Sequence, residues 1–175
     1  MRVIIATVAS LDGRLTRGDD PNVHAWSSVE DWHHFVELRN QSDALIMDRA
    51  AYEQVRPEPE ENLLRVIMAA HPELYSDRHI KGQLEFMQPD PKKIIANLRR
   101  RHIEQVLIAG DTLVTYDFLA AGQVDELYMT FEPVLFGTGA PVMSGAHDLG
   151  VRVQLIDVQK LNEQGTIIAH YTVVR

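Results

Sequence analysis

Asp48 and Arg49 raise the clearest chemical question in this chain, because they follow the apolar run 44–47 and precede the helix-like stretch 50–55. A strand that leads directly into a helix N-terminus is a common phosphate site, since unpaired N–H groups and the positive end of the helix dipole point outward there. Two interpretations of the Asp48 carboxylate stay open. It caps the helix, or it faces a bound phosphate that Arg49 also contacts.

Several other kinds of site are excluded by the residue types. The chain has no cysteine, so it has no disulfide, thiolate nucleophile or thiolate metal site. His33 and His34 are sequence neighbours, about 100° apart on a helix, and cannot readily share one metal ion. The sequence contains no G-x-S-x-G, Walker-type or G-x-G-x-x-G motif. We therefore predict no metal site, and no motif supports acyl transfer or P-loop chemistry.

The composition predicts one domain over residues 1–175, because a chain of this length with 45% hydrophobic residues can bury a sizeable core. The formal charge of −8 argues against a nucleic acid or an anionic membrane as the main partner and favours a small-molecule substrate. No apolar run approaches the ~20 residues of a membrane span, and the N-terminus does not resemble a secretion signal. We expect a cytoplasmic protein.

Strand-like and helix-like segments alternate through about residue 122, which predicts an α/β fold with a largely parallel sheet covered on both faces. Helices are predicted from Ser28, after Asp48, from Asp90 with Pro91 at its first turn, and over 112–122. Two terminal runs around Gly165 predict a hairpin that adds antiparallel strands at one edge. The predicted strands are about eight, over 3–9, 43–47, 64–70, 84–87, 105–110, 125–136, 151–161 and 166–174.

Side-chain spacing within these segments predicts what is buried. The first helix carries Trp32, Phe35 and Val36 as an apolar stripe, with Ser27 or Ser28 as its N-cap. The core of the sheet is expected to contain one residue from the middle of each of five predicted strands, namely Ile4, Leu45, Ile67, Leu107 and Leu127.

Four segments occur in order along the chain: 10-SLDG-13, 26-WSSVED-31, 43-DALIM-47, and 124–139 with its VDEL and PVLFGTG sequences. This set resembles the reductase domain of riboflavin biosynthesis, a relative of dihydrofolate reductase. The resemblance implies a dihydrofolate reductase-like fold with a mixed, mostly parallel sheet, usually paired into a homodimer through its terminal strands. It also implies reduction of a pyrimidine or pterin-like heterocycle, or of the sugar-imine of a pyrimidine intermediate, with hydride from NADPH.

The resemblance assigns the substrate side to the loop after the first strand and to the start of the first helix. Asp31, four residues before Phe35, matches the acid of dihydrofolate reductase, and Asp12 would accompany it as a catalytic residue. A partly buried carboxyl group there would have a raised pKa and could deliver a proton. The alternatives are a first-turn Asp that favours the helix dipole and an Asp-Gly turn. The implied substrate-binding residues are Trp26, Ser28, Gly137 and Gly139, although a plain loop is the alternative for the two glycines.

The cofactor contacts implied by the resemblance would come from Arg49, Gly110, Asp111 and Thr112. This chain departs from the family there. Asp48 replaces a glycine, Ala51 replaces a phosphate-binding hydroxyl, Ala69-Ala70 replaces Ser or Thr, and the Gly-rich turn is Ala109-Gly110-Asp111. At an effective dielectric near 20, a carboxylate ~6 Å from a phosphate charge costs about 2–3 kcal/mol. We therefore predict that NADPH binds more weakly here than to active relatives.

Two functions follow from these observations. The first is a reductase that uses NADPH, and the second is a non-catalytic small-molecule-binding or scaffolding dimer on the same fold. The family's substrate-binding lysine is replaced by Ala6, which argues against a phosphoribosyl-pyrimidine substrate.

Overall fold

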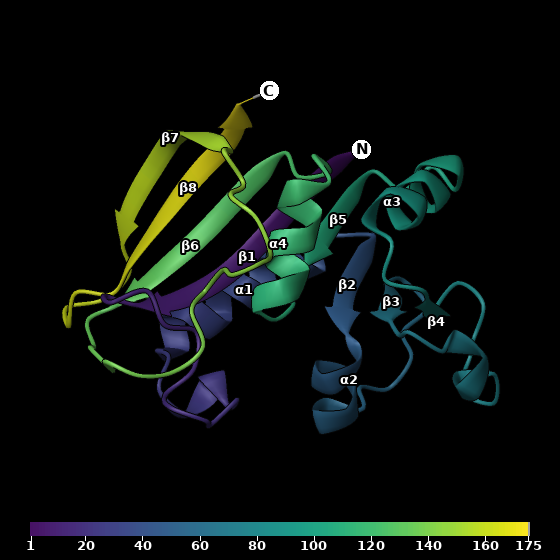
Figure 1. The fold of residues 1–175 in the computed structure, drawn as a ribbon, viewed down its shortest axis with the longest axis horizontal. Helices are drawn as coiled ribbons and strands as arrows, with labels where there is room; N and C mark the ends of the chain where they lie inside the picture. The colour runs from purple at the N-terminus through teal and green to yellow at the C-terminus, as the bar shows by residue number, and fades with distance from the viewer. Residues whose placement is uncertain (175) are drawn as a thin grey trace.

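The computed structural model describes residues 1–174 and contains an eight-stranded sheet in the order β4-β3-β2-β5-β1-β6-β8-β7 (Figure 1). The six strands from β4 to β6 run parallel, whereas β8 is antiparallel to β6 and to β7. This arrangement confirms the predicted mixed, mostly parallel sheet. The strands are β1 Arg2–Ser10, β2 Ala44–Asp48, β3 Leu64–Met68, β4 Leu84–Met87, β5 Gln105–Ile108, β6 Glu126–Glu132, β7 Arg152–Lys160 and β8 Ile167–Val174.

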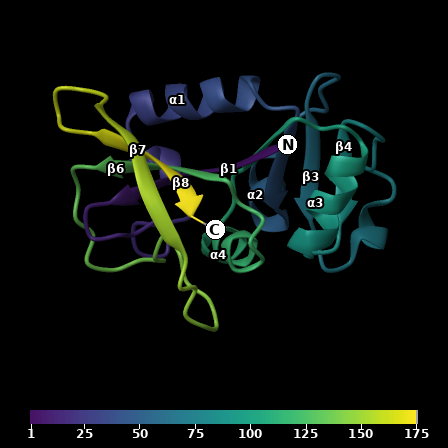
Figure 2. The same cartoon turned by 90° about the horizontal axis from the view of Figure 1, so that it is seen from above.

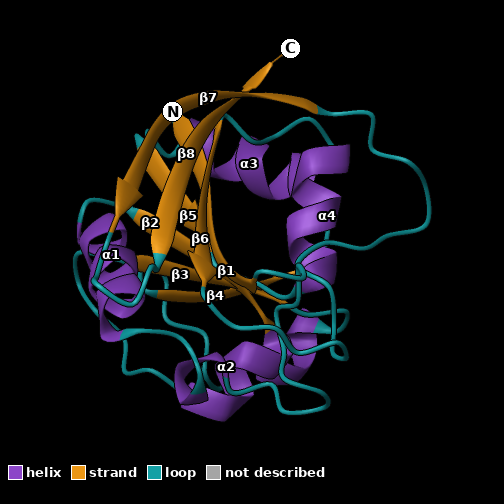
Figure 3. Ribbon diagram, turned by 90° about the vertical axis from the view of Figure 1, so that its left-hand side faces the viewer, coloured by secondary structure: helices purple, strands orange, loops and turns teal. Residues whose placement is uncertain are grey.

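Helices cover both faces of the sheet, as predicted. Helix α1 (Val29–Asn40) lies on one face, and α3 (Pro91–Arg100) and α4 (Thr112–Ala120) lie on the other (Figures 2 and 3). Helix α2 (Arg49–Val55) lies beyond the end of β2, and two short 3₁₀ helices, η1 (Val23–Ala25) and η2 (Pro72–Tyr75), occur in loops. Within residues 1–174, no helix combines the length and apolarity that crossing a membrane requires.

Each α-helix begins with a side chain that accepts a hydrogen bond from a backbone N–H of its first turn. The capping residues are Ser28, Asp48, Asp90 and Asp111. The predicted caps at Ser28 and Asp90 are confirmed, and so is the interpretation of Asp48 as a cap. These contacts satisfy N–H groups that a helix cannot pair internally.

The core lies against both faces of the central strands, and the five residues predicted for it are all buried. The larger cluster packs α3 and α4 against one face through residues such as Phe118 and Ile94. A smaller cluster, with Ile4 and Leu107, lies on the face under α1.

Helix α1 differs from the prediction. Trp32 is 41% exposed, and the only residue of α1 that is fully buried is Leu38. Asp31 and His34 face the sheet, where His34 lies 5.3 Å from the ring of Tyr128. The predicted stripe is confirmed only in part: Phe35 packs against the smaller cluster, but Trp32 does not. Asp31, His34 and Leu38 also recur at spacings of three and four, and they face a polar strand surface.

The direction in which the connections move across the sheet reverses between β5 and β1. The connection from β1 through α1 leads past β5 to β2, whereas the connection from β5 through α4 leads past β1 to β6. Right-handed crossovers in opposite directions put α1 and α4 on opposite faces and leave a crevice between them at the strand ends. This crevice is the expected place for a ligand.

Candidate functional site

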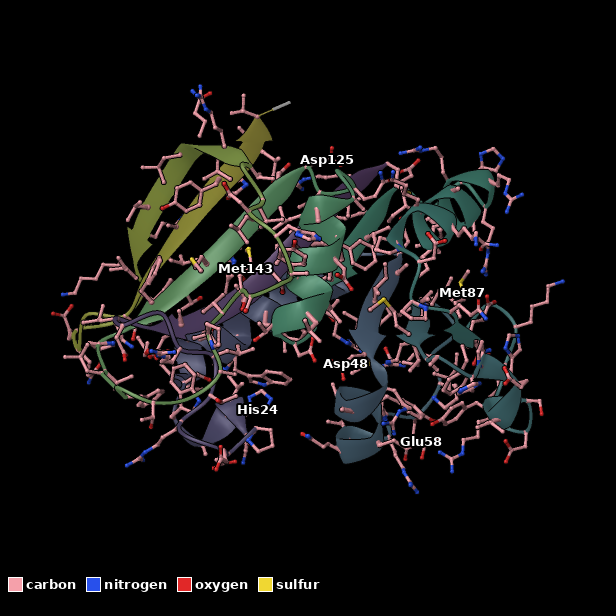
Figure 4. The ribbon with its side chains drawn as sticks, viewed as in Figure 1. His24, Asp48, Glu58, Met87, Asp125 and Met143 are labelled. Atoms are coloured by element: carbon pink, nitrogen blue, oxygen red, sulfur yellow. The ribbon has the colours of Figure 1, made fainter. Side chains whose placement is uncertain are left out.

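The candidate site lies at the carboxyl ends of the parallel strands and has two parts. The substrate half comprises the ends of β1 and β6, the start of α1 and the loop 133–142. The cofactor half comprises the ends of β2 and β5 with the starts of α2 and α4. Figure 4 shows Asp48 at this edge of the sheet, where β2 passes into α2, while Asp125 marks the opposite edge, where β6 begins.

Asp31 is the titratable group at the centre of the substrate half. It lies in the first turn of α1, and its backbone N–H donates to the Ser28 hydroxyl at 3.2 Å. Burial is the largest cause that raises the pKa of the Asp31 carboxyl; a hydrogen bond from Thr130 opposes the rise, and the charge of Glu132 adds to it. A carboxyl group in this environment holds its proton to higher pH than an exposed Asp does.

Glu132 organises the substrate half, and the sequence prediction did not include it. Its side chain is only 3% exposed, yet it accepts hydrogen bonds from the Ser28 backbone N–H (2.7 Å) and from the Thr166 hydroxyl (2.6 Å). Asn162 continues this network by donating to Thr166 and to Glu30. Glu132 therefore ties β6, the start of α1 and the turn before β8 into one unit. The sequence feature that could have pointed to Glu132 is its position directly before a proline.

Asp12 joins the loop after β1 to the loop 133–142. Its carboxylate accepts hydrogen bonds from the Ser10 hydroxyl (2.7 Å) and from the backbone N–H groups of Phe136 (3.0 Å) and Gly137 (2.7 Å). The hydrogen bonds, that from Ser10 above all, lower the pKa of Asp12 to about 2. At neutral pH such a group is an anion that positions the two loops, so a catalytic role in proton donation is not supported for Asp12.

The two predicted glycines have different surroundings. Gly139 has a φ of 124°, and a Cβ placed on it would lie 2.0 Å from the carbonyl oxygen of Thr16, so the absence of a side chain serves loop packing. Gly137 also has a positive φ, but nothing lies near its Cβ position. Their contact with a substrate stays a prediction.

Trp26 forms one wall of an open hollow of about 690 Å³ beside this network. Its ring packs edge-on against Phe136, with the ring centroids 4.9 Å apart. Arg17 and Thr138 also contribute to the lining. Glu132 connects Ser28 to β6, and Phe136 connects Trp26 to Asp12. Trp26 lines the hollow, whereas a substrate pocket that Asp12, Ser28 and Asp31 share with it stays a prediction.

In the cofactor half, carboxylates occupy the helix N-termini. Asp48 Oδ1 accepts a hydrogen bond from the Ala51 N–H (2.8 Å), and Asp111 Oδ1 accepts from both Leu113 N–H and Val114 N–H (2.9 Å each). These are the N–H groups that would otherwise be available to a phosphate. One first-turn N–H of α2 and two of α4 are therefore already in use.

The other predicted cofactor residues lie at the same turns. A Cβ on Gly110 would fall 2.5 Å from the Val114 side chain, so this glycine permits close packing of α4. The Thr112 hydroxyl donates to the Pro141 carbonyl, and Arg49 is an exposed cation at the start of α2. Arg49 alone among these residues offers an anion a free positive charge.

A second polar cluster lies under α1 towards the opposite edge of the sheet. Arg2 forms two hydrogen bonds with Glu126 (2.6 and 2.5 Å), and His170 lies 2.6 Å from the same carboxylate. The His170 ring stacks on Tyr128 at 4.0 Å. Together with Thr130 and Glu132, these contacts make the α1-facing side of β6 polar along its length. Within residues 1–174, no group of three or more acidic or histidine side chains is arranged to hold a metal ion.

Comparison with known families now identifies the lineage of this chain. Residues 1–167 match the model of the RibD C-terminal domain. The chain belongs to the RibD C-terminal domain family. Membership of this family supports a reductase-like role, as the resemblance implied.

Individual relatives are distant in sequence. A Bacillus subtilis (strain 168) protein described as uncharacterized, YwjB, is 22% identical over 171 residues, covering 88% of this chain and 95% of the relative. A pyrimidine reductase-like protein from Corynebacterium diphtheriae superposes with a TM-score of 0.79 at 15% identity, covering 99% of this chain and 92% of its own. The Enterococcus faecalis dihydrofolate reductase complexed with NADP(H) has a TM-score of 0.70 at 18% identity, covering 99% of this chain and 97% of its own. These neighbours confirm the dihydrofolate reductase-like fold.

The RibD family implies NADPH as cofactor, but the donor set of this chain does not fit its phosphates. Asp48 takes one first-turn N–H of α2 and Asp111 takes two of α4, and each cap adds a negative charge where a phosphate would be negative as well. The cofactor half therefore departs from the family in its charges, and the substrate half departs from it at Ala6.

Proposed function

We propose that the protein is a reductase of a small pyrimidine or pterin-like heterocycle, or of a related imine, in which Asp31 donates the proton. Reduction of a C=N bond adds hydride to carbon and a proton to nitrogen. The observation that supports this proposal is the Asp31 carboxyl, buried beside Glu132 with a raised pKa. Such an acid keeps its proton closer to neutral pH, where a general acid is most useful. The hydride comes from a dissociable reductant, and the role of Asp31 does not depend on which one.

The groups around Asp31 define how a substrate would be held. Ser27 and Thr130 hydrogen-bond the carboxyl, and Glu132 fixes the backbone of Ser28. Trp26 and Phe136 provide apolar ring surfaces next to this polar centre. Ala6 places no charge on the α1-facing side of β1, so we propose a heterocycle that lacks the phosphoribosyl group.

The test is Asp31→Asn, assayed on a panel of pyrimidines, pterins and cyclic imines with millimolar NADPH or NADH. We expect turnover to fall by roughly 10²-fold or more, because a positioned proton donor is lost, while the substrate KM changes little. Asn can still accept the hydrogen bonds of Thr130 and Ser27, so the fold should persist, as circular dichroism would check. A variant with full turnover would remove Asp31 from the mechanism.

The second candidate function is a non-catalytic small-molecule-binding protein, and the caps at Asp48 and Asp111 favour it. Both functions use the hollow beside Trp26, so ligand binding quenches tryptophan fluorescence in either case. They differ in turnover. A substrate panel that binds but is not reduced by any nicotinamide reductant would establish the binding protein.

We further propose that the protein pairs as a two-fold homodimer through β7. Every residue of this edge strand is exposed, and Val153, Leu155, Ile156 and Val158 are each 43–54% exposed. A long apolar edge strand of this kind is normally covered in solution. Sedimentation at micromolar concentration should give twice the chain mass of 19.9 kDa. A mass equal to that of one chain would contradict this proposal.

A further inference from the structure

We propose that Asp48 and Asp111 act as built-in anions that exclude phosphate groups from the cofactor half, so that this half takes the uncharged, phosphate-free part of a ligand. The inference rests on the proposed reductase site. The inference is tested by binding affinity, whereas proton donation by Asp31 is tested by turnover. Either one can therefore fail while the other holds.

The two carboxylates accept hydrogen bonds from N–H groups that a phosphate would use. A single oxygen of Asp111 accepts from two consecutive backbone N–H groups of α4, at 2.9 Å each. A phosphate at this N-terminus would have to displace that carboxylate and then lie next to its charge. Helix N-termini bind anions through these groups, so an anion supplied by the chain itself competes directly.

The two carboxylates also belong to adjoining turns. Strands β2 and β5 are neighbours, and the Ala109 N–H donates to the Ile46 carbonyl at 2.9 Å, so the two strands stay paired up to their ends. Asp48 follows Ile46 by two residues, and Asp111 follows Ala109 by two. Neighbouring strands lie about 4.8 Å apart. A ligand crossing this end of the crevice therefore passes both acids.

The charges around Asp48 and Asp111 are mostly negative. Within residues 1–174, neither Asp48 nor Asp111 takes part in an ion pair. Asp117, on the next turn of α4, adds a third acid, and the charge of Asp111 contributes to raising its pKa, after burial. On α2, Arg49 is the cation of the first turn, whereas Glu53 on the following turn is paired with Arg56 and Arg78. Asp48, Asp111 and Asp117 therefore outnumber Arg49.

Gly110 does not indicate a phosphate site beside these acids. In a phosphate-binding turn a glycine lets the backbone approach the ligand, but here a Cβ would collide with Val114 at 2.5 Å. The glycine is therefore required by the packing of α4, whether or not a ligand is present. Nothing else at this turn marks a phosphate site.

The test compares NADPH with reduced nicotinamide riboside, which has no phosphate, on the wild type and on Asp48→Asn/Asp111→Asn. Asn is as good an N-cap as Asp, so the double variant removes two charges and keeps both helix starts. Calorimetry or tryptophan fluorescence gives each affinity. We expect the double variant to bind NADPH at least 10-fold more tightly than the wild type, and the riboside to change less than about 2-fold.

Salt dependence provides a second readout. Added salt should strengthen NADPH binding to the wild type by screening repulsion, and this effect should vanish or reverse in the double variant. Asp111→Ala is the matched control for the cap, because it removes the charge and also the two hydrogen bonds. Low-micromolar NADPH binding by the wild type would overturn the inference. So would a double variant with unchanged NADPH affinity, or one that gains equally for the riboside.

Discussion

The two halves of the site use the same kind of side chain in opposite ways. In the substrate half, Glu132 joins residues 104 and 34 positions away in the sequence, and it is almost fully buried. In the cofactor half, Asp48 and Asp111 bond only to N–H groups two or three positions further along. A long-range carboxylate defines how elements meet, whereas a local carboxylate completes its own helix. The substrate half is therefore held together by contacts between distant elements, and the cofactor half by contacts within single helix starts.

The largest effect that would test this contrast is on stability. Glu132→Ala should lower the free energy of unfolding by about 3 kcal/mol, because the Ser28 N–H and the buried Thr166 hydroxyl lose their acceptor. Asp111→Ala should lower it by only about 1 kcal/mol, the usual effect of losing an N-cap. Urea unfolding of both variants measures the difference.

Glu132→Gln serves as the control for shape, since it keeps an acceptor oxygen and removes the charge. It should be less destabilising than Glu132→Ala, and it should lower the pKa of Asp31 by removing a nearby negative charge. Equal losses for Glu132→Ala and Asp111→Ala would show that the two halves are not constrained differently.

A smaller effect concerns the pH dependence of stability inside the substrate half, where two acids have opposite shifts. The pKa of Asp12 is lowered from 3.8 to about 2, so its contribution is present above pH 3.8 and is lost as the pH falls towards 2. The pKa of Asp31 is raised, so folding is most favoured while it is protonated, and stability falls as the pH rises from 3.8 through the raised pKa.

Single substitutions separate the contributions of Asp12 and Asp31 to the pH dependence of stability. Asp12→Asn should flatten the loss of stability at acid pH, and Asp31→Asn should remove the loss on the alkaline side. Urea midpoints measured between pH 2 and pH 8 would show both. Matching pH profiles for Asp31→Asn and the wild type would mean that the Asp31 carboxyl is not shifted.

The same division between local and long-range contacts explains how much the sequence could predict. The caps at Ser28, Asp48 and Asp90 are local, and their residue types reveal them. The dihydrofolate reductase-like fold with its mostly parallel sheet also followed once the ordered motifs were found. The core residues followed because parallel strands buried on both faces are apolar throughout.

Glu132 and the inward face of α1 could not be found in this way. Glu132 sits in 126-ELYMTFE-132, where alternate polar residues suggest a solvent-facing side, yet α1 covers that side. The polar pairs that fill it, such as Arg2 with Glu126, join residues 124 positions apart. No periodicity within one segment reveals which polar side chains will meet across the sheet, so Trp32 was chosen for the core and Asp31 and His34 were not.

The polar surface of β6 also leaves α1 with little buried apolar area. Helices α1 and α2 have one buried side chain each, Leu38 and Tyr52, whereas α3 has three and α4 has four. Elements with little buried apolar area open at low free energy, and their amide hydrogens exchange early. Since Ser28 and Asp31 both belong to the start of α1, the substrate half exists only while this helix is docked. A ligand that binds there holds α1 in place, so slowed amide exchange in α1 reports occupancy of the site without any assay of turnover.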